Sequence, residues 1–233
     1  MSTFLELCAD LAEQVGMSSA PASVVGQTGE NKKIVDRIAQ ADLEIQNMWQ
    51  DWNFLFSASE FSQALTVDDA TYDGPSDLGT FDEDSFYIDR TLDTYQKLDE
   101  LDYKIWRRDY RNGTQVSGTP TNFAITSANG VVLYPPPDSA YTLTADYWVA
   151  PSVMTGNTDV SKIPEQFHRI IVVKAKMYYA EEDDAPEVMR AAMMEFKNNN
   201  NYGSLLDQLE AFSLPKNKNR RRAEGPAITV VPE

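Results

Sequence analysis

The spacing of apolar residues predicts two helices at the start of the chain. In the first, Thr3 and Glu6 form a capping-box pattern and Gly16 marks the end. Its apolar stripe consists of Phe4, Leu7, Cys8, Leu11 and Val15. The second helix is predicted over residues 31–52, where apolar residues recur every three or four positions without an internal glycine or proline. A loop of small, polar and glycine residues is expected between them, over residues 17–30.

Beyond residue 53 the apolar spacing shortens to two, which is typical of β-strands. Aromatic and aliphatic residues follow this spacing through residues 54–67, and a short strand is predicted over residues 85–90. Residues 68–84 are acidic and rich in turn-forming types, so a long loop is expected there. Residues 99–110 fit either a strand or a helix capped by Asp99. We favour the short helix.

The block of residues 118–149 gives the clearest β signal. Asn129 followed by Gly130 is typical of a two-residue hairpin turn, in which both residues take a positive φ. Such a turn places Ile125 opposite Tyr134. Three prolines then end the strand because they cannot donate to a ladder. The alternation of apolar and polar residues over 141–149 predicts a long, half-buried antiparallel strand.

Helical spacing returns near Pro164, which is a favourable residue for a first turn. Asp184 and Glu187 form a second capping-box pattern, which opens a helix expected to continue to Phe212. Asparagines and a glycine within residues 198–203 weaken the middle of that helix. A bend or a split into two helices is therefore expected there.

These elements predict an α+β fold that is mainly α. It is an antiparallel helical bundle with an inserted antiparallel β region and an extended C-terminal arm. The predicted divisions are the first helices of the bundle over 1–53, the β-rich insertion over 54–150, the last helices over 151–214 and a basic arm over 215–233. A hydrophobic content of 42% is sufficient for a substantial core.

The net charge of −16 excludes nucleic-acid binding by simple phosphate neutralisation. Residues 215–233 hold five cations and two carboxylates, a net of +3, so the rest of the chain carries −19. Such a body repels DNA. That property suits a wall along which DNA slides.

The basic arm continues into an apolar, β-prone run at residues 228–231 that has no partner strand nearby in the sequence. An extended apolar segment of this kind typically pairs with another chain, and the alternative is a flexible chain end. The residues predicted to bind a partner are Lys216, Lys218, Arg220, Arg221, Arg222, Ile228, Val230 and Val231.

Reactive side chains are few. Cys8 is the only cysteine, which excludes an internal disulfide, and a buried position is expected for it. His168 is the only histidine, and a structural role, exposed or hydrogen-bonded, is expected. The acidic runs at 82–84 and 181–184 lack the spacing of an EF-hand. No catalytic, cofactor-binding or metal-binding residue is predicted, and no cofactor.

Aromatic and basic residues offer two further candidates. The four tryptophans could form a stacking platform, but positions in the core are favoured because two of them extend the apolar stripe of residues 31–52. Arg107, Arg108 and Arg111 form a small basic spot beside Trp106. It is expected to neutralise nearby carboxylates or to meet another subunit. No stretch is long and apolar enough to predict a membrane span, and no signal peptide is recognised.

Three segments together carry a family resemblance. A helix is expected to end in MWQDWNF at residues 48–54. GTPTNFAI is followed by NGVVLYPPPD and by a strand that closes on Tyr147. Helix then returns through IPEQF at residues 163–167. This order resembles the head–tail adaptor proteins of tailed bacteriophages, also called head-completion or connector proteins, over most of residues 1–212.

The resemblance implies a structural virion protein without enzymatic activity. Adaptors form a homo-oligomeric ring, usually a dodecamer, between the portal protein and a tail or nozzle protein. The ring extends the DNA channel, through which DNA passes without specific binding, and it provides the tail attachment surface. A C-terminal arm commonly reaches the portal. The implied location is the virion, at the head–tail interface, after assembly in the host cytoplasm, with no membrane partner.

Two other functions stay open from the sequence. One is a tail or receptor-type binding module that uses the aromatic β insertion to hold a protein or a glycan. The other is a carboxylate enzyme, for which the number of acidic residues is the only support.

Overall fold

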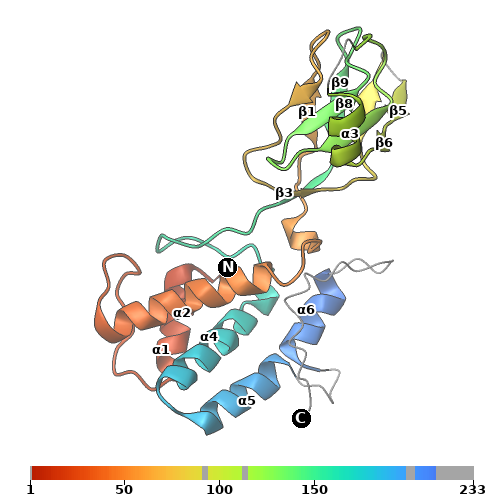
Figure 1. Cartoon of the computed structure of the whole chain (residues 1–233). Coiled ribbons are helices and arrows are strands. Elements are labelled where there is room, and N and C mark those ends of the chain that lie inside the picture. The colour runs from red at the N-terminus through yellow and green to blue at the C-terminus, as the bar shows by residue number, and fades with distance from the viewer. Residues whose placement is uncertain (1, 91–93, 112–114, 198–202, 214–233) are drawn as a thin grey trace. The chain divides into compact units, whose positions relative to one another are not determined.

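A computed structural model describes residues 2–90, 94–111, 115–197 and 203–213. The chain divides into two compact units (Figure 1). The helical unit comprises residues 1–55 together with 151–233, and the β unit comprises residues 56–150. The described residues form six α-helices and several sheets that are largely antiparallel, so the expected α+β class is confirmed.

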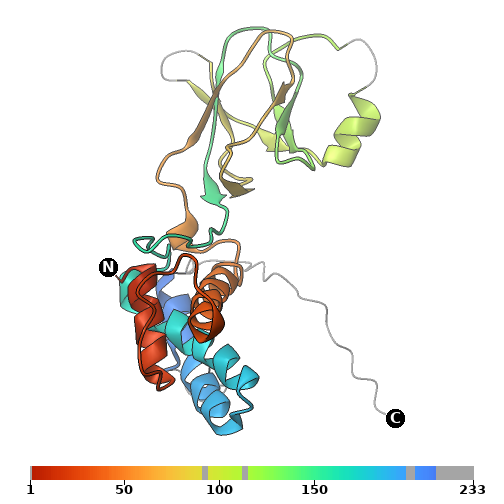
Figure 2. The ribbon, with the colours of Figure 1, turned by 90° about the vertical axis from the view of Figure 1, so that its left-hand side faces the viewer.

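The helical unit is built from both ends of the chain (Figures 1 and 2). Its helices are α1 (Phe4–Gln14), α2 (Gly29–Gln46), α4 (Arg169–Glu182), α5 (Pro186–Phe196) and α6 (Leu205–Ser213), with 3-10 turns at Asn53–Leu55 and Glu165–Phe167. Helix α4 contacts each of the other four. Six successive α4 residues, 170–175, are buried, because partner helices cover more than one side of it.

The charged member of that buried run is Lys174, which is 8% exposed. Its Nζ lies 3.1 Å from Glu44 Oε2 of α2, and it also sits 5.2 Å from the centre of the Phe196 ring. Tyr178 donates a hydrogen bond to the same Glu44 oxygen. A buried ammonium is tolerated only with such partners, and here they join α2, α4 and α5.

The predicted start of the first helix is confirmed. Thr3 Oγ1 accepts from the Glu6 backbone N–H at 3.3 Å, and the Thr3 N–H donates to Glu6 Oε2 at 2.8 Å. Each side chain therefore satisfies a backbone donor that the helix leaves unpaired. Gly16 follows the last turn with a φ of +75°, a left-handed conformation that favours glycine.

The second helix is shorter than predicted, because α2 ends at Gln46 and not at residue 52. Asn47 Nδ2 donates to the Leu43 carbonyl at 2.8 Å, and Trp52 Nε1 donates to the Ile45 carbonyl at 3.1 Å. These side chains satisfy carbonyls of the last turn, so the chain can leave the helix without exposing them. Trp52 is fully buried, as its apolar spacing indicated, but it lies beyond the helix.

The C-terminal helices also differ in detail. Helix α5 has Ala185 as its N-cap without a side-chain hydrogen bond, so the capping box predicted for Asp184 and Glu187 is wrong. Asp184 instead has a φ of 51°, which turns the chain between α4 and α5. The expected split is confirmed, since α5 ends at Phe196 and α6 begins at Leu205.

The described residues of the β unit form two four-stranded sheets and a strand pair. The first sheet has the order β1 (Phe61–Ala64), β9 (Thr142–Ala145), β4 (Tyr87–Asp89), β5 (Tyr95–Lys97). The second has the order β2 (Thr71–Tyr72), β8 (Val131–Tyr134), β7 (Asn122–Ile125), β6 (Asp99–Glu100). The pair joins β10 (Tyr147–Val149) to β3 (Leu78–Phe81). Neighbours are antiparallel except for β6 and β7, which are parallel.

The two four-stranded sheets pack face to face. Phe61, Ile88 and Leu143 of the first sheet share one apolar core with Phe123 and Leu133 of the second. The opposite face of the second sheet is covered by α3 (Tyr103–Asp109), whose Trp106 packs on Ala124 and Val132. The layers therefore run from the outer face of the first sheet, through the core and the second sheet, to α3.

The hairpin forms where predicted but in a different register. Phe123 pairs with Leu133 and Ile125 pairs with Val131, so the predicted pairing of Ile125 with Tyr134 is wrong. Thr126 Oγ1 accepts from the Gly130 N–H at 2.9 Å, and of the two expected turn residues only Asn129 has a positive φ, 61°. The hydroxyl thus favours a longer turn than the two-residue type.

Other β elements correct the sequence interpretation. The stretch expected as a loop over 68–84 contains β2 and β3. The strand predicted over 141–149 breaks at Asp146 into β9 and β10, which join different sheets. The short helix is confirmed, but its cap is Asp102, whose Oδ1 accepts from the Lys104 N–H at 2.7 Å. The predicted cap, Asp99, lies in β6. The strand predicted over 85–90 is confirmed as β4.

A buried polar network fixes α2 to the segment that returns from the β unit. Asp42 is fully buried and accepts hydrogen bonds from Ser161 Oγ and, at 2.8 Å, from Gln46 Nε2. Gln46 also exchanges two hydrogen bonds of 3.2 Å with the backbone of Ser152. Burial raises the pKa of Asp42 to about 6, because the charged carboxylate is poorly solvated.

We expect Asp42→Asn to change the pH dependence of stability. The folded pKa lies above the ordinary value of 3.8, so folding favours the protonated acid and loses stability as pH rises through about 6. Over pH 5 to 8 the wild type should lose about 1 kcal/mol relative to the asparagine variant. Urea unfolding of both proteins at several pH values measures this difference. A difference that does not change with pH would show that Asp42 titrates normally.

We expect Leu143→Ala to destabilise the β unit by about 2–5 kcal/mol, because it leaves a cavity in the shared core of the two sheets. Leu143 is fully buried, whereas its neighbour Thr144 points to the other side of the sheet. Thr144→Ala is the matched control and should cost less than about 1 kcal/mol. Urea unfolding followed by circular dichroism compares the two. Equal losses would contradict the assigned faces of β9.

Candidate functional site

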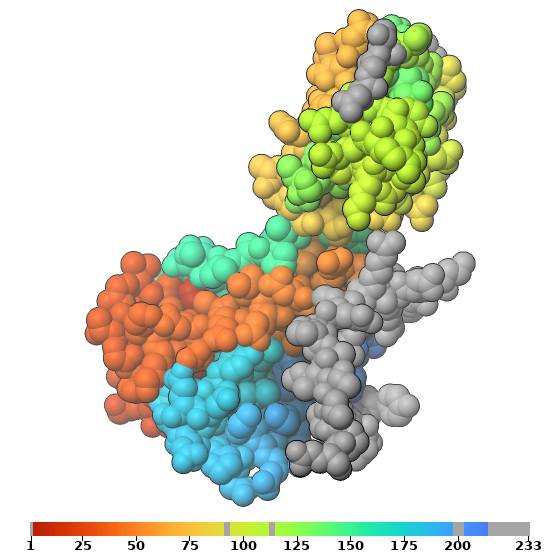
Figure 3. All heavy atoms as spheres, viewed as in Figure 1, coloured from red at the N-terminus to blue at the C-terminus, as the bar shows by residue number. Residues whose placement is uncertain are grey.

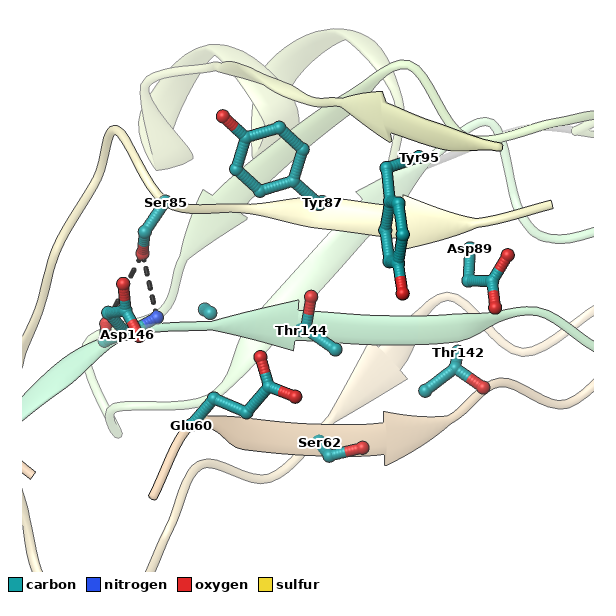
Figure 4. A pocket seen from close by; sticks show the side chains of 10 residues that line it. Glu60, Ser62, Ser85, Tyr87, Asp89, Tyr95, Thr142, Thr144 and Asp146 are labelled. Atoms are coloured by element: carbon teal, nitrogen blue, oxygen red, sulfur yellow. Dashed lines mark hydrogen bonds between the residues drawn. The ribbon is translucent and has the colours of Figure 1, made fainter. Parts of the chain in front are cut away.

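A shallow depression of about 500 Å³ lies on the outer face of the first sheet (Figure 4). Its walls come from β1, β4, β5 and β9 and from the residues next to them. They are Glu60, Ser62, Ser85, Tyr87, Asp89, Tyr95, Thr142, Thr144, Ala145 and Asp146. We call this surface the polar face.

Strand alternation positions these side chains. Leu143 enters the core, so Thr142 and Thr144 on either side of it point outward. In register, Asp89 lies opposite Thr142 and Tyr87 lies opposite Thr144, on the same side of the sheet. Figure 4 shows the two tyrosine rings above a row of hydroxyl and carboxyl groups.

The polar face is negatively charged. Glu60, Asp89 and Asp146 line it, and its lining includes no lysine or arginine. The nearest cation in register is Lys97, opposite Tyr87, and its Nζ lies 3.2 Å from Asp84. Asp89 Oδ1 is shielded from solvent and has no hydrogen-bond partner among the described residues. A hydrogen-bond donor or a cation that docks here would satisfy it.

Hydrogen bonds of Ser85 fix one part of the depression. Ser85 Oγ accepts from the Asp146 N–H at 2.8 Å and donates to the Asp82 carbonyl at 2.7 Å. Tyr95 is 66% exposed and Tyr87 is 37% exposed. Two accessible rings beside fixed acceptors can recognise cations, hydroxyl groups or flat groups.

Helix α3 provides a second charged surface, on the outside of the β unit (Figure 3, yellow-green). Trp106 holds the helix on the second sheet, and the exposed cations Lys104, Arg107, Arg108 and Arg111 face away from it. We call these four residues the basic face. Arg108 pairs with Asp109 at 2.6 Å. Within the described part of the chain, the other three form no ion pair, although Arg107 lies 5.8 Å from the centre of the Tyr103 ring.

The predicted basic spot beside Trp106 is therefore a real cluster on one surface. Only one of its three arginines, Arg108, neutralises a carboxylate in the described residues. The other suggested role, contact with a subunit, stays a prediction. The residues predicted to bind a partner lie outside the described residues: Lys216, Lys218, Arg220, Arg221, Arg222, Ile228, Val230 and Val231.

The tryptophans do not gather into one platform. Trp52 belongs to the helical unit and Trp106 to the β unit, and both are buried, as the core interpretation predicted. Trp49 donates from Nε1 to Glu210 Oε1 at 3.1 Å. Trp148 packs edge-on against Phe56 at 5.3 Å.

The candidate reactive residues have structural roles. His168 is 4% exposed, its Nε2 lies 2.9 Å from the Ile163 carbonyl, and burial lowers its pKa. This confirms the hydrogen-bonded alternative. Cys8 is fully buried, as expected, and burial raises the pKa of its thiol to about 12.

The acidic runs serve local contacts. In the run at 82–84, Asp82 Oδ1 accepts from the Asp84 N–H at 3.1 Å. In the run at 181–184, Glu182 pairs with Arg37 of α2. Among the residues that the structure describes, no three His, Cys, Asp or Glu side chains are grouped as metal ligands.

Sequence reasoning missed the polar face. Its residues come from four strands that are distant in sequence, and only the fold brings them together. The alternation Thr142, Leu143, Thr144 was a usable signal of an outward polar row, but it did not identify the strands beside it.

Comparison with known proteins identifies a family to which the chain is similar. A family model described as SU10 adaptor protein matches residues 2–228, nearly the whole chain. No match is found among the curated proteins. In the described helices, none has both the length and the apolar character for a membrane crossing. The family match confirms the resemblance to phage head–tail adaptors. On that match, the chain belongs to the SU10 adaptor protein family.

Proposed function

We propose that this phage adaptor forms a homo-oligomeric ring between the portal and the tail, extends the DNA channel and provides the tail attachment surface. The observation that carries the proposal is the family match over residues 2–228. Membership of an adaptor family implies contacts with other phage proteins, a structural role and a place in the virion. The ring, its position and its partners are the finer part of the proposal.

The charge supports a role next to DNA without binding it. The chain carries −16, and without residues 215–233 it carries −19. A negatively charged wall keeps phosphates from adhering, so DNA passes without specific contacts. The same charge makes the copies repel one another, so their association requires local pairs of opposite charge or apolar contact.

The proposed ring is a dodecamer that contacts the portal protein on one side and a tail or nozzle protein on the other. It assembles in the host cytoplasm and stays at the head–tail interface of the virion. In a cyclic ring each copy presents one surface to the next copy and a different surface to the previous one. Electron microscopy of the purified protein with its portal tests for such rings.

We assign attachment to the portal to residues 215–233. The five cations at 216–222 suit an acidic partner surface, and the β-prone run at 228–231 suits the edge of a partner sheet. No enzymatic step is part of the proposal, because adaptor function consists of assembly.

A second candidate function uses the polar face as a binding site for a glycan or a tail protein. The observation that favours it is the pair of exposed rings, Tyr87 and Tyr95, beside hydroxyl and carboxyl groups. Tyr95→Ala should then reduce retention on a glycan array or a tail-protein column. If the Tyr95→Ala variant is retained as well as the wild type, or if the wild type is not retained at all, this candidate function is wrong.

We expect a chain that ends at residue 213 to lose portal binding while its body remains folded. The deletion removes the proposed contact segment and no described residue. Co-sedimentation with portal particles measures binding, and circular dichroism measures folding. Replacing the five cations at 216–222 with glutamine, with residues 228–231 intact, separates charge from strand pairing. Normal attachment of the truncated chain would remove the assignment of the arm.

A further inference from the structure

We propose that neighbouring copies associate through the β unit, with the basic face of one copy docked on the polar face of the next. The proposal rests on the ring proposed above and names the surfaces that would hold it together. The occupant of each face is a second copy of this chain.

The two faces lie on opposite sides of the same layered unit. In the first sheet, Leu143 points into the core, while Thr144 points to the polar face. In the second sheet, Leu133 points into the core, while Val132 packs under α3. The core separates the two faces, so they cannot meet within one β unit. They can meet between copies, and each docked pair leaves one basic face and one polar face open for further copies.

The positive charge of the β unit is concentrated on one face. Residues 56–150 contain six lysines and arginines, and four of them form the basic face. The other two have partners inside the unit, because Lys97 pairs with Asp84 and Arg90 donates to Gln96. The polar face has the opposite character, with three carboxylates and no cation in its lining. Oppositely charged faces on a strongly acidic chain define where copies can touch.

Side-chain chemistry adds to the charge. Ile105, 39% exposed, follows Lys104 in α3 and offers an apolar contact beside the cations. Tyr87 and Tyr95 offer ring faces to arginine guanidinium groups, an arrangement that stabilises cation–π pairs. The Asp89 oxygen that lacks a partner among the described residues would accept from an arriving lysine or arginine.

Charge reversal in the full chain tests the contact. The first variant carries Lys104→Glu and Arg111→Glu on the basic face. The second carries Glu60→Lys and Ser62→Lys on the polar face, where both native side chains are exposed. A third variant combines all four changes. The control, Arg190→Glu with Lys197→Glu on exposed positions of the helical unit, changes net charge as much as the first variant.

Self-association is measured by sedimentation velocity, and ring formation by electron microscopy, with and without the portal. Each two-residue change should weaken association at least about tenfold, since it places like charges opposite each other. The combined variant restores opposite charges and should recover to within about threefold of wild type. The control should associate like the wild type.

The contact is overturned if either reversal leaves association unchanged, if the combined variant is no better than the single reversals, or if the wild type stays monomeric alone and on the portal. The contact is also overturned if a chain ending at residue 213 loses association while the basic-face changes have no effect. That result would identify the basic arm as the occupant of the polar face. If rings form on the portal in both two-residue variants, the proposed contact between the two faces is wrong, but the proposed function still holds. If copies associate through the two faces but do not bind the portal, the contact is supported and the proposed function is wrong.

Discussion

The β unit depends on the burial of apolar side chains between its two four-stranded sheets. Phe86 and Phe123 stack there with ring centres 3.8 Å apart, and both are essentially inaccessible to solvent. Burying rings and branched side chains from both sheets provides the main stabilising free energy of such a sandwich. Because strand side chains alternate, this core also decides which residues point outward. The outward side chains of the first sheet are rich in hydroxyl and carboxyl groups. Those of the second sheet include the small apolar residues Ala124 and Val132, on which α3 packs.

The same alternation explains what could be predicted from the sequence. Helical stripes, the capping box at Thr3 and the strands at the hairpin follow from local spacing, and they were found. The hairpin register was missed because the hydroxyl of Thr126 bonds to Gly130 and extends the turn. The end of α2 was missed because the apolar stripe continues through Trp52. The side chain of Trp52 folds back and donates to the Ile45 carbonyl of the helix. Spacing reports which side chains are buried but not where the backbone stops being helical.

The candidate surfaces were only partly predictable. The basic face is nearly contiguous in sequence, so Arg107, Arg108 and Arg111 could be recognised together. To recognise the polar face one must know the order of four strands in the sheet, and no local sequence pattern contains that order. The partner-binding residues proposed at the C-terminus come from sequence reasoning alone. In the helical unit, the network around Asp42 was likewise invisible, because Ser161 is brought to it from more than a hundred residues away.

The insertion of the β unit has a mechanical consequence. The backbone passes between the two units twice, near residues 55 and 151, so a tensile force on one unit is divided between two covalent connections. On the β side these connections are fastened to each other, because the Ser57 N–H donates to the Tyr147 carbonyl at 2.9 Å and Phe56 packs on Trp148. A pull on the β unit would therefore be carried by two chain segments that are bonded to each other. A unit appended at one end of the sequence would hang from a single connection and bear the whole load there.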